Sequence, residues 1–398
     1  MSEKSGFDVV VVGGGVIGLA CAWRLAQRGA KVVVLEKGLP GGGATRVAAG
    51  MLAPVGELTF GEPELLELTL AASRMYPEFV AELEAATGQS TGYERLGALH
   101  VALDRDEAAQ LRRVHDLQRS LDLEAEWLST RQCRELEPGL APSFHGGVLA
   151  AGEAAIDPRA LTAVLVAACA AEGVEVRTGT EVVGGVFDGE CLVGVRTSKG
   201  HYDTHTVSNR PFDEEIAAES VLLACGAWSG RADWLPPEAR PAVRPVKGQV
   251  VELRSRDGEP PARHILASER VYLVPRSDGR LVVGATVEEM GLDTTVTAGG
   301  VHELLREAYR LLPDVAEMEL VDAIAGLRPG TPNNLPLVGP GAIDGLVLAT
   351  GHYRNGILLA PLAAQTVADH LSANRRSSFY RYSRPKDERA VTKVGPGA

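Results

Sequence analysis

The sequence lacks the features that usually mark disulfide-rich, metal-binding, membrane or nucleic-acid-binding proteins. Its five cysteines are scattered and form no CxxC pair, so we expect neither a disulfide framework nor a zinc site. No run approaches the roughly 18 apolar residues of a membrane span, and residues 1–7 are too short and polar for a signal peptide. The net charge of −12 disfavours nucleic acid and anionic membranes as partners. We therefore expect a cytoplasmic protein without a bound metal.

The composition is that of a globular protein: 45% of the residues are hydrophobic and 23% are charged. A length of 398 residues predicts about two domains. One HxxxH spacing occurs, His201 to His205, in the polar segment 198–219. This segment has no helical periodicity, so the two histidines are not expected to share a metal ion, and we assign the segment no role.

The first forty residues combine a β-branched run, a glycine-rich turn and an Ala/Leu-rich helix. Strand residues 8–12 are followed by Gly13-x-Gly15-x-x-Gly18. In a dinucleotide-binding fingerprint, these glycines permit the tight turn, let the backbone approach a pyrophosphate, and let the helix pack closely on the strand. The free N–H groups of the helix N-terminus favour a phosphate. An ordinary βα turn is the alternative interpretation.

A second β-rich run, residues 31–35, ends at an acid, Glu36, 21 residues after Gly15. A carboxylate at this point can accept hydrogen bonds from ribose hydroxyls and would repel a 2′-phosphate, which disfavours NADP. With both strands, the helix and the acid present, the sequence predicts a Rossmann-like unit that binds a dinucleotide. The motif alone does not distinguish FAD from NAD.

A loop rich in glycine and alanine, residues 38–53, follows this unit. Such a loop can lie against a flat ring without steric conflict, and Thr45 and Arg46 offer a hydroxyl and a cation to phosphate or flavin. A flexible linker is the alternative, but residues 47–52 are too apolar to be solvated. We therefore predict a wall of the cofactor site. A second contact is expected where the apolar strand 220–224 ends in a small-residue turn at Gly226.

The remaining pattern predicts further helices and strands. Helices are expected at 62–87, interrupted near Pro77, and at 104–123, 158–171, 301–312 and 356–371. Strands are expected at 96–102, 174–177, 249–253, 321–327 and 346–350, with a hairpin formed by 271–276 and 280–286. The last strand runs into Gly351-His-Tyr-Arg-Asn-Gly356 and then a helix. Such a helix N-terminus can stabilise negative charge on a reduced flavin.

Together, the opening motif, the loop at 41–51 and the loop at 351–356 resemble the FAD-dependent D-amino-acid oxidase superfamily, in particular its glycine oxidase branch of the thiamine pathway. The resemblance covers nearly the whole chain and is most specific at residues 48–52, 245–248, 272–276, 326–331 and 351–361. It implies an α/β fold with a Rossmann-like FAD-binding domain (1–91, 144–241 and 326–398) interleaved with an antiparallel-sheet substrate domain (92–143 and 242–325).

The resemblance also implies roles for individual residues. The adenosine-binding positions are Val16, Ile17, Glu36 and Lys37, with Val182 beside the adenine. The positions that line the flavin are Ala44, Thr45, Ala49, Gly50 and Met51, and the flavin-edge loop comprises His352, Tyr353, Arg354, Asn355, Gly356, Ile357 and Leu358. Sarcosine oxidases attach flavin through a cysteine in the segment that matches 330–332. This chain has none there, so the FAD is expected to be non-covalent.

The substrate carboxylate is expected to face Arg328 and Arg354, with Tyr272 as an aromatic neighbour. A guanidinium grips a carboxylate with two parallel hydrogen bonds, which lysine cannot reproduce. Any single arginine is more often a surface residue, and Tyr272 could be a core aromatic. Val287 is smaller than the side chain that some relatives carry, which leaves open the preference between glycine and bulkier D-amino acids.

The predicted activity is oxidative deamination of glycine and other small amines or D-amino acids to the imine, with O2 reduced to hydrogen peroxide. The imine of glycine would serve thiamine thiazole synthesis or hydrolyse. Three alternatives stay open: a D-amino-acid or sarcosine-type dehydrogenase that passes electrons to another carrier, a protein that holds FAD structurally, and an NAD-dependent dehydrogenase. The family also predicts a homo-oligomer, a tetramer or dimer.

Overall fold

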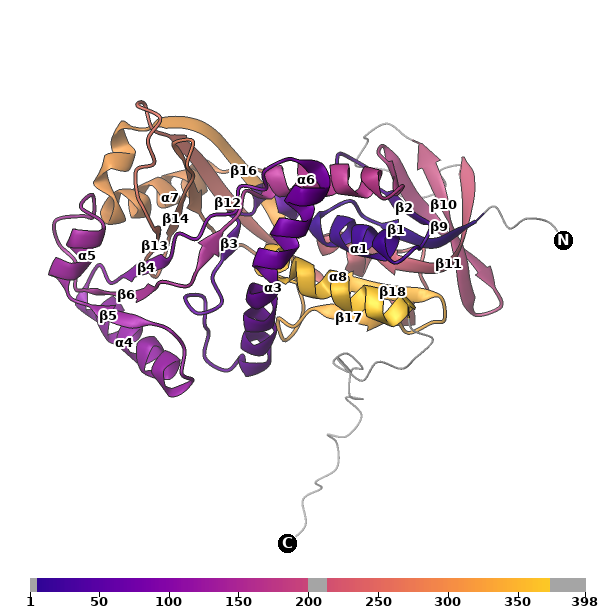
Figure 1. The fold of residues 1–398 in the computed structure, drawn as a ribbon, viewed down its shortest axis with the longest axis horizontal. Coiled ribbons are helices and arrows are strands. Elements are labelled where there is room, and N and C mark those ends of the chain that lie inside the picture. Colours follow the sequence, from indigo (N-terminus) through magenta and orange to yellow (C-terminus); the bar gives the residue numbers. More distant parts are fainter. Residues whose placement is uncertain (1–5, 200–212, 373–398) are drawn as a thin grey trace, which may run out of the picture.

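The computed structural model describes residues 6–199 and 213–372, which form two eight-stranded sheets and one two-stranded sheet (Figure 1). The first sheet has a parallel centre. Its order is β17 (Leu337–Pro340), β18 (Leu346–Thr350), β11 (Glu214–Leu223), β1 (Phe7–Val12), β2 (Val32–Leu35) and β8 (Glu175–Arg177). β17 alone in this path pairs antiparallel. The predicted Rossmann-like unit is thus present, with strand β1 at the middle of the sheet.

Valines on β1 explain why both faces of this sheet are covered. Val9 and Val11 pack against helices, whereas Val10 and Val12 pack against the opposite layer, as the two-residue period of a strand requires. The helical layer contains α1 (Val16–Gln27), α3 (Pro63–Thr87), α6 (Pro158–Ala171) and α8 (Gly356–Ser372). The opposite layer contains β9 (Thr180–Asp188) and β10 (Cys191–Lys199), which extend the sheet from β11.

The second sheet is mainly antiparallel and lies at the other end of the molecule (Figure 1). Its order is β16 (Glu319–Gly330), β12 (Arg244–Arg254), β15 (Arg280–Gly284), β14 (Tyr272–Pro275), β13 (Ile265–Ala267), β4 (Ala98–Val101), β6 (Gly147–Ala150) and β5 (Glu126–Leu128). Helix α7 (Ala298–Leu311) packs on it, and α4 (Arg105–Ser120) and α5 (Thr130–Leu136) lie between β4 and β6 in the sequence. The predicted β14–β15 hairpin is confirmed.

The expected interruption of the helix near Pro77 is wrong, because α3 continues through this residue. A proline removes one backbone hydrogen bond of a helix, at a cost of about 3 kcal/mol. Here Tyr76 and Phe79 on either side are buried with α1 in one core, and burial of two such aromatic rings offsets the cost. Helix α6 begins as predicted, because the Asp157 side chain accepts hydrogen bonds from the backbone N–H groups of Arg159 and Ala160.

Some sequence expectations fall on residues that the structure does not describe. His201 and His205 lie there, with most of segment 198–219 and the chain after residue 372. Among the described residues, no helix is long and apolar enough to cross a membrane, and no group of three or more candidate metal ligands occurs.

Candidate functional site

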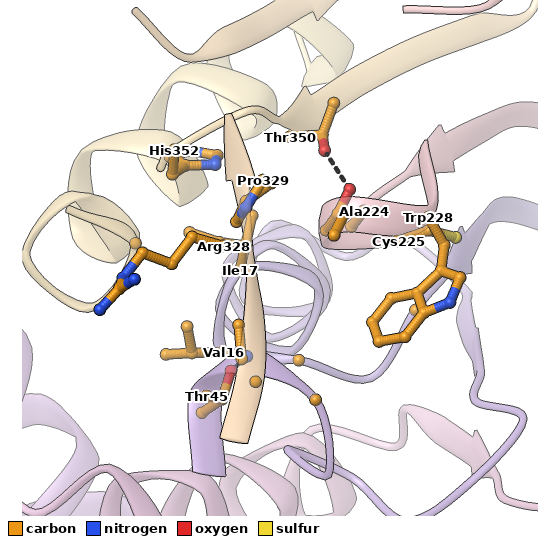
Figure 2. A pocket seen from close by; sticks show the side chains of 18 of the residues that line it. Val16, Ile17, Thr45, Ala224, Cys225, Trp228, Arg328, Pro329, Thr350 and His352 are labelled. Atoms are coloured by element: carbon orange, nitrogen blue, oxygen red, sulfur yellow. Dashed lines mark hydrogen bonds between the residues drawn. The ribbon is translucent and has the colours of Figure 1, made fainter. Parts of the chain in front are cut away.

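A cavity of about 900 Å³ lies where the two large sheets meet. The first sheet contributes the ends of β1 and β2, through Val12 and Leu35, and the second contributes Val250 of β12, Tyr272 of β14 and Arg328 of β16. In the close-up, Arg328 and Trp228 lie on opposite sides, with the N-terminus of α1 between them (Figure 2). The cavity therefore has two ends with different side chains, one beside Trp228 and the other beside Arg328.

The N-terminus of α1 forms the floor between these ends. Gly13 has a φ of +111°, and a Cβ at this position would lie 2.5 Å from the carbonyl oxygen of Ala224. A Cβ on Gly18 would lie 2.0 Å from the carbonyl oxygen of Gly13, so the helix packs directly on the turn. The backbone N–H of Val16 donates to the Thr45 hydroxyl over 3.2 Å. The unpaired donors and positive end of α1 favour an anion here.

Glu36 shapes the first end of the cavity. Its two carboxylate oxygens accept hydrogen bonds from the backbone N–H groups of Gly14, over 2.8 Å, and Gly38, over 2.7 Å. A carboxylate offers about four lone-pair positions, so Glu36 can still accept from ribose hydroxyls. Beside it, the ammonium of Lys37 lies 5.0 Å from the ring centre of Trp228. Val182 of β9 also lines this end, and both the aromatic ring and the carboxylate suit a nucleoside.

The loop predicted to line a flavin forms a wall of the cavity. It contains the short helix α2 (Ala44–Val47) and the strand β3 (Met51–Leu52), which pairs with β7 (Ala154–Ala155). Gly50 has a φ of +75°, and a Cβ there would lie 1.9 Å from the carbonyl oxygen of Ile156. The buried guanidinium of Arg276 donates to the carbonyl oxygen of Ala49. These contacts fix the wall from the second sheet.

Arg328 and Tyr272 lie at the second end of the cavity. One guanidinium nitrogen of Arg328 donates to the carbonyl oxygens of Thr286, over 3.0 Å, and Lys247, over 3.4 Å. A Cβ on Gly248 would lie 2.3 Å from this guanidinium, so glycine leaves the room that it occupies. Burial raises the pKa of Tyr272 to about 12, although Arg328 lowers it. The phenol therefore stays protonated and can donate a hydrogen bond.

The loop between β18 and α8 closes this end. The backbone N–H of Tyr353 donates to the carbonyl oxygen of Pro329 over 2.9 Å, which ties the loop to β16. Asn355 precedes α8 and its carbonyl oxygen accepts from the N–H of Leu359 over 2.8 Å. His352 is 2% exposed, and burial lowers its pKa to about 3, so its ring is neutral. Arg354 is exposed and projects from the same loop.

The structure brings most of the predicted site residues to one cavity. Three of them do not line it: Gly18 packs under the turn, and Asn355 and Leu358 are buried beside it. The predicted residues that line it are Gly13, Gly15, Val16, Ile17, Glu36, Lys37, Ala44, Thr45, Arg46, Ala49, Gly50, Met51, Val182, Gly226, Tyr272, Arg328, His352, Tyr353, Arg354, Gly356 and Ile357. Val287 is 63% exposed and lies outside the lining, so its size does not set the pocket volume.

Several lining residues are absent from the sequence prediction, among them Glu57, Trp228 and Gly248. Trp228 follows the turn at Gly226, which was a usable signal. Glu57 lies on the irregular connection between β3 and α3, and no pattern in the sequence indicates it. Burial raises the pKa of Glu57 above its ordinary range, and Arg354 and Arg328 act in the opposite direction.

The lining fits an FAD. A Cβ added at Gly15 would have no neighbouring atom within 3.4 Å, so a pyrophosphate can approach the backbone there. Gly15 lies between the end of the cavity that suits a nucleoside and the end that carries Arg328 and Arg354. Cys225 borders the cavity, and burial raises its pKa to about 12, so it offers a neutral thiol.

Comparisons with known proteins agree with this geometry. The model of the FAD dependent oxidoreductase (DAO) family matches residues 8–370. The glycine oxidase of Geobacillus kaustophilus is 36% identical over 91% of this chain and 92% of its own length. The crystal structure of glycine oxidase from that organism covers 94% of this chain and 96% of its own, with a TM-score of 0.83 and 34% identity. The bifunctional protein ThiO/ThiG of Trichormus variabilis is 36% identical over 97% of this chain.

The chain spans 56% of the length of that bifunctional relative. The family match, in contrast, includes both sheets and every segment that lines the cavity. The protein is therefore a member of the FAD dependent oxidoreductase family, and its cofactor is FAD.

Proposed function

We propose that the protein oxidises glycine and other small amines or D-amino acids to the imine, with O2 as the electron acceptor and hydrogen peroxide as the product. One observation carries the proposal: two guanidinium groups, Arg328 and Arg354, line one end of the FAD cavity beside Tyr272. Neither forms an ion pair with a carboxylate of residues 6–199 or 213–372. Both are available to a carboxylate that enters from solvent.

Arg328 orients the substrate. Its contacts with the carbonyl oxygens of Thr286 and Lys247 use one nitrogen, and it also interacts with the Tyr272 hydroxyl. The remaining N–H donors can grip the substrate carboxylate with two parallel hydrogen bonds. Arg354, on the exposed loop, adds a second positive charge. Holding the carboxylate at one point fixes the direction of the Cα–H bond, and such positioning lowers the entropic part of the barrier.

The remaining residues adapt the cavity to the cofactor. When bound, FAD accepts a hydride from the substrate and is oxidised again by O2. The N-terminus of α8 lies beside His352, where it can stabilise the negative charge of the reduced ring. His352 stays neutral at physiological pH, so the positive end of the helix supplies this stabilisation. Tyr272 donates its hydroxyl hydrogen to the substrate.

Anaerobic mixing with substrate tests this function directly. Purified yellow protein should lose its flavin absorbance on addition of glycine, sarcosine or D-alanine, and should release hydrogen peroxide when air is admitted. Rapid bleaching without peroxide, together with fast dye reduction, would instead indicate a dehydrogenase. A flavin spectrum that none of the three amines changes would contradict the proposal.

The proposal also covers the domain boundaries, the cellular location and the oligomeric state of the protein. We infer that residues 1–91, 144–241 and 326–398 form the FAD-binding domain, and 92–143 and 242–325 the substrate domain. The second sheet supports this division, although β6 follows residue 143 and β16 crosses residue 325. We further propose a cytoplasmic homo-oligomer whose imine product supplies thiazole synthesis, by analogy with the relatives named ThiO/ThiG.

A further inference from the structure

Glu57 is a half-buried carboxyl group at the substrate end of the cavity. Two other carboxyl groups of the described chain line this cavity, Glu36 and Glu181. They lie on or directly after strands β2 and β9, at the nucleoside end. Glu57 is thus the carboxyl of the described lining that can meet the amine of a substrate held by Arg328.

The backbone that carries Glu57 is held firmly. The buried carboxyl group of Glu153 accepts hydrogen bonds from the N–H groups of Val55, over 2.9 Å, and Gly56. The side-chain amide of Gln118 donates to the carbonyl oxygen of Val55 over 2.9 Å. The N–H of Glu57 itself donates to the carbonyl oxygen of Ala53 over 3.1 Å. Because the preceding residues are tied to α4 and to the turn between β6 and β7, the backbone position of Glu57 at the cavity is defined.

Charged and titratable groups face Glu57 from every element around it. Arg328 from β16 and Arg354 from the loop after β18 lower its pKa, while burial raises it more. Glu57 in turn raises the pKa values of Tyr272 on β14 and of Glu153. A carboxyl whose pKa lies above its ordinary range is a better proton acceptor, and perturbed groups of this kind gather at catalytic sites.

We propose that Glu57 accepts a proton from the ammonium group of the substrate before the Cα–H bond is broken. This inference rests on the proposed function. An N–H bond of the ammonium breaks, an O–H bond forms on the Glu57 carboxylate, and the electron pair stays on the substrate nitrogen. From there it can form the C=N bond as hydride leaves Cα for the flavin. The proton and both electrons are thereby accounted for.

Two other groups near the substrate fit this role less well. Tyr272 has a pKa of about 12, so its phenol is already protonated and cannot accept a second proton at neutral pH. His352 is neutral, but burial lowers its pKa to about 3, so it holds a proton poorly, and its Nε2 atom is buried. Glu57 combines the required basicity with a place in the lining.

The test compares Glu57→Gln with Glu57→Asp and with the control Glu64→Gln. Glu64 is an exposed carboxylate in the first turn of α3 that does not line the cavity. Anaerobic flavin reduction by glycine is followed across a range of pH. At neutral pH we expect the kcat/KM of Glu57→Gln to fall about 100-fold or more, the typical contribution of a general base. The deficit should shrink to a few-fold once the pH exceeds the pKa of the free amine. Glu57→Asp should recover part of the rate, and Glu64→Gln should match the wild type.

A second measurement separates proton transfer from general damage to the site. Acetate carries the carboxylate but no amine, so its binding, followed through the flavin absorbance spectrum, should be as tight in Glu57→Gln as in wild type, or tighter because one negative charge near Arg328 is removed. A Glu57→Gln variant as active as wild type, or one equally impaired at every pH, would overturn the role of Glu57 while the proposed function stands. Wild-type flavin that no amine bleaches would overturn both.

Discussion

The buried carboxyl of Glu153 makes the stability of the protein depend on pH in an unusual direction. Burial raises its pKa to about 8, from an unfolded value of 4.5, despite the N–H groups of Val55 and Gly56 that favour the charged form. Its second oxygen is buried without a partner. The folded state therefore binds more protons than the unfolded state between these two values. The resulting stability is fully present below pH 4.5 and is lost as the pH rises through 8.

Replacement by glutamine tests this reasoning. Glu153→Gln keeps a carbonyl oxygen for the two N–H groups but cannot ionise. Each unit of pKa shift corresponds to about 1.4 kcal/mol, so the shift implies at most about 5 kcal/mol between acid and alkaline pH. An opening of the loop at residues 53–57 would relieve part of this penalty. Between about pH 5 and about pH 9, we therefore expect the stability of Glu153→Gln to rise by about 2–4 kcal/mol relative to the wild type.

Urea unfolding of the FAD-loaded protein at both pH values measures this gain, because contributions from all other titrating groups cancel between wild type and variant. Glu172→Gln, at an exposed position after α6, is the matched control and should show no such gain. A stability difference between wild type and Glu153→Gln that is the same at both pH values would refute the reasoning.

Three further changes test the cofactor and substrate ends. Arg328→Ala should raise the KM for glycine by about two orders of magnitude or more and leave FAD bound, whereas an unchanged KM would remove Arg328 from the site. Gly18→Ala places a Cβ 2.0 Å from the carbonyl oxygen of Gly13, so thermal unfolding should show a loss of at least about 2 kcal/mol, together with loss of flavin. Glu36→Ala removes the acceptor of two backbone N–H groups, and fluorescence titration of the apoprotein should show FAD affinity weakened about tenfold or more.

The sequence predicts those parts of the fold that short-range patterns determine. The βαβ unit, the helix start at Asp157 and the β14–β15 hairpin depend on periodicity, capping and turn residues that are adjacent in the chain. Pro77 shows the limit of such rules, because burial of the surrounding aromatic side chains in the tertiary core outweighs the missing hydrogen bond. Local propensity cannot register that compensation.

The candidate site likewise contains residues that the sequence indicates and residues that it does not. Gly13 and Glu36 belong to a motif with fixed spacing, and a family resemblance indicated Arg328, which then proved to line the cavity. Glu57 has no such signal. Its importance arises from contacts that Glu153 makes with the backbone nearly a hundred positions away. Val287 differs from the expectation for another reason: its position in the sequence does not show that its side chain faces solvent.

The strand order of the two sheets has a consequence for synthesis of the protein. β1 lies between β2 and β11, and β4 pairs in parallel with β13, so each sheet joins segments from both halves of the chain. A nascent polypeptide on the ribosome exposes one edge of β1 and one edge of β4 long before β11 and β13 emerge. Pairing between distant segments folds slowly, and unpaired strand edges promote aggregation. We therefore expect fragments that end before β18 to require chaperones or to precipitate, whereas the full-length chain folds cooperatively.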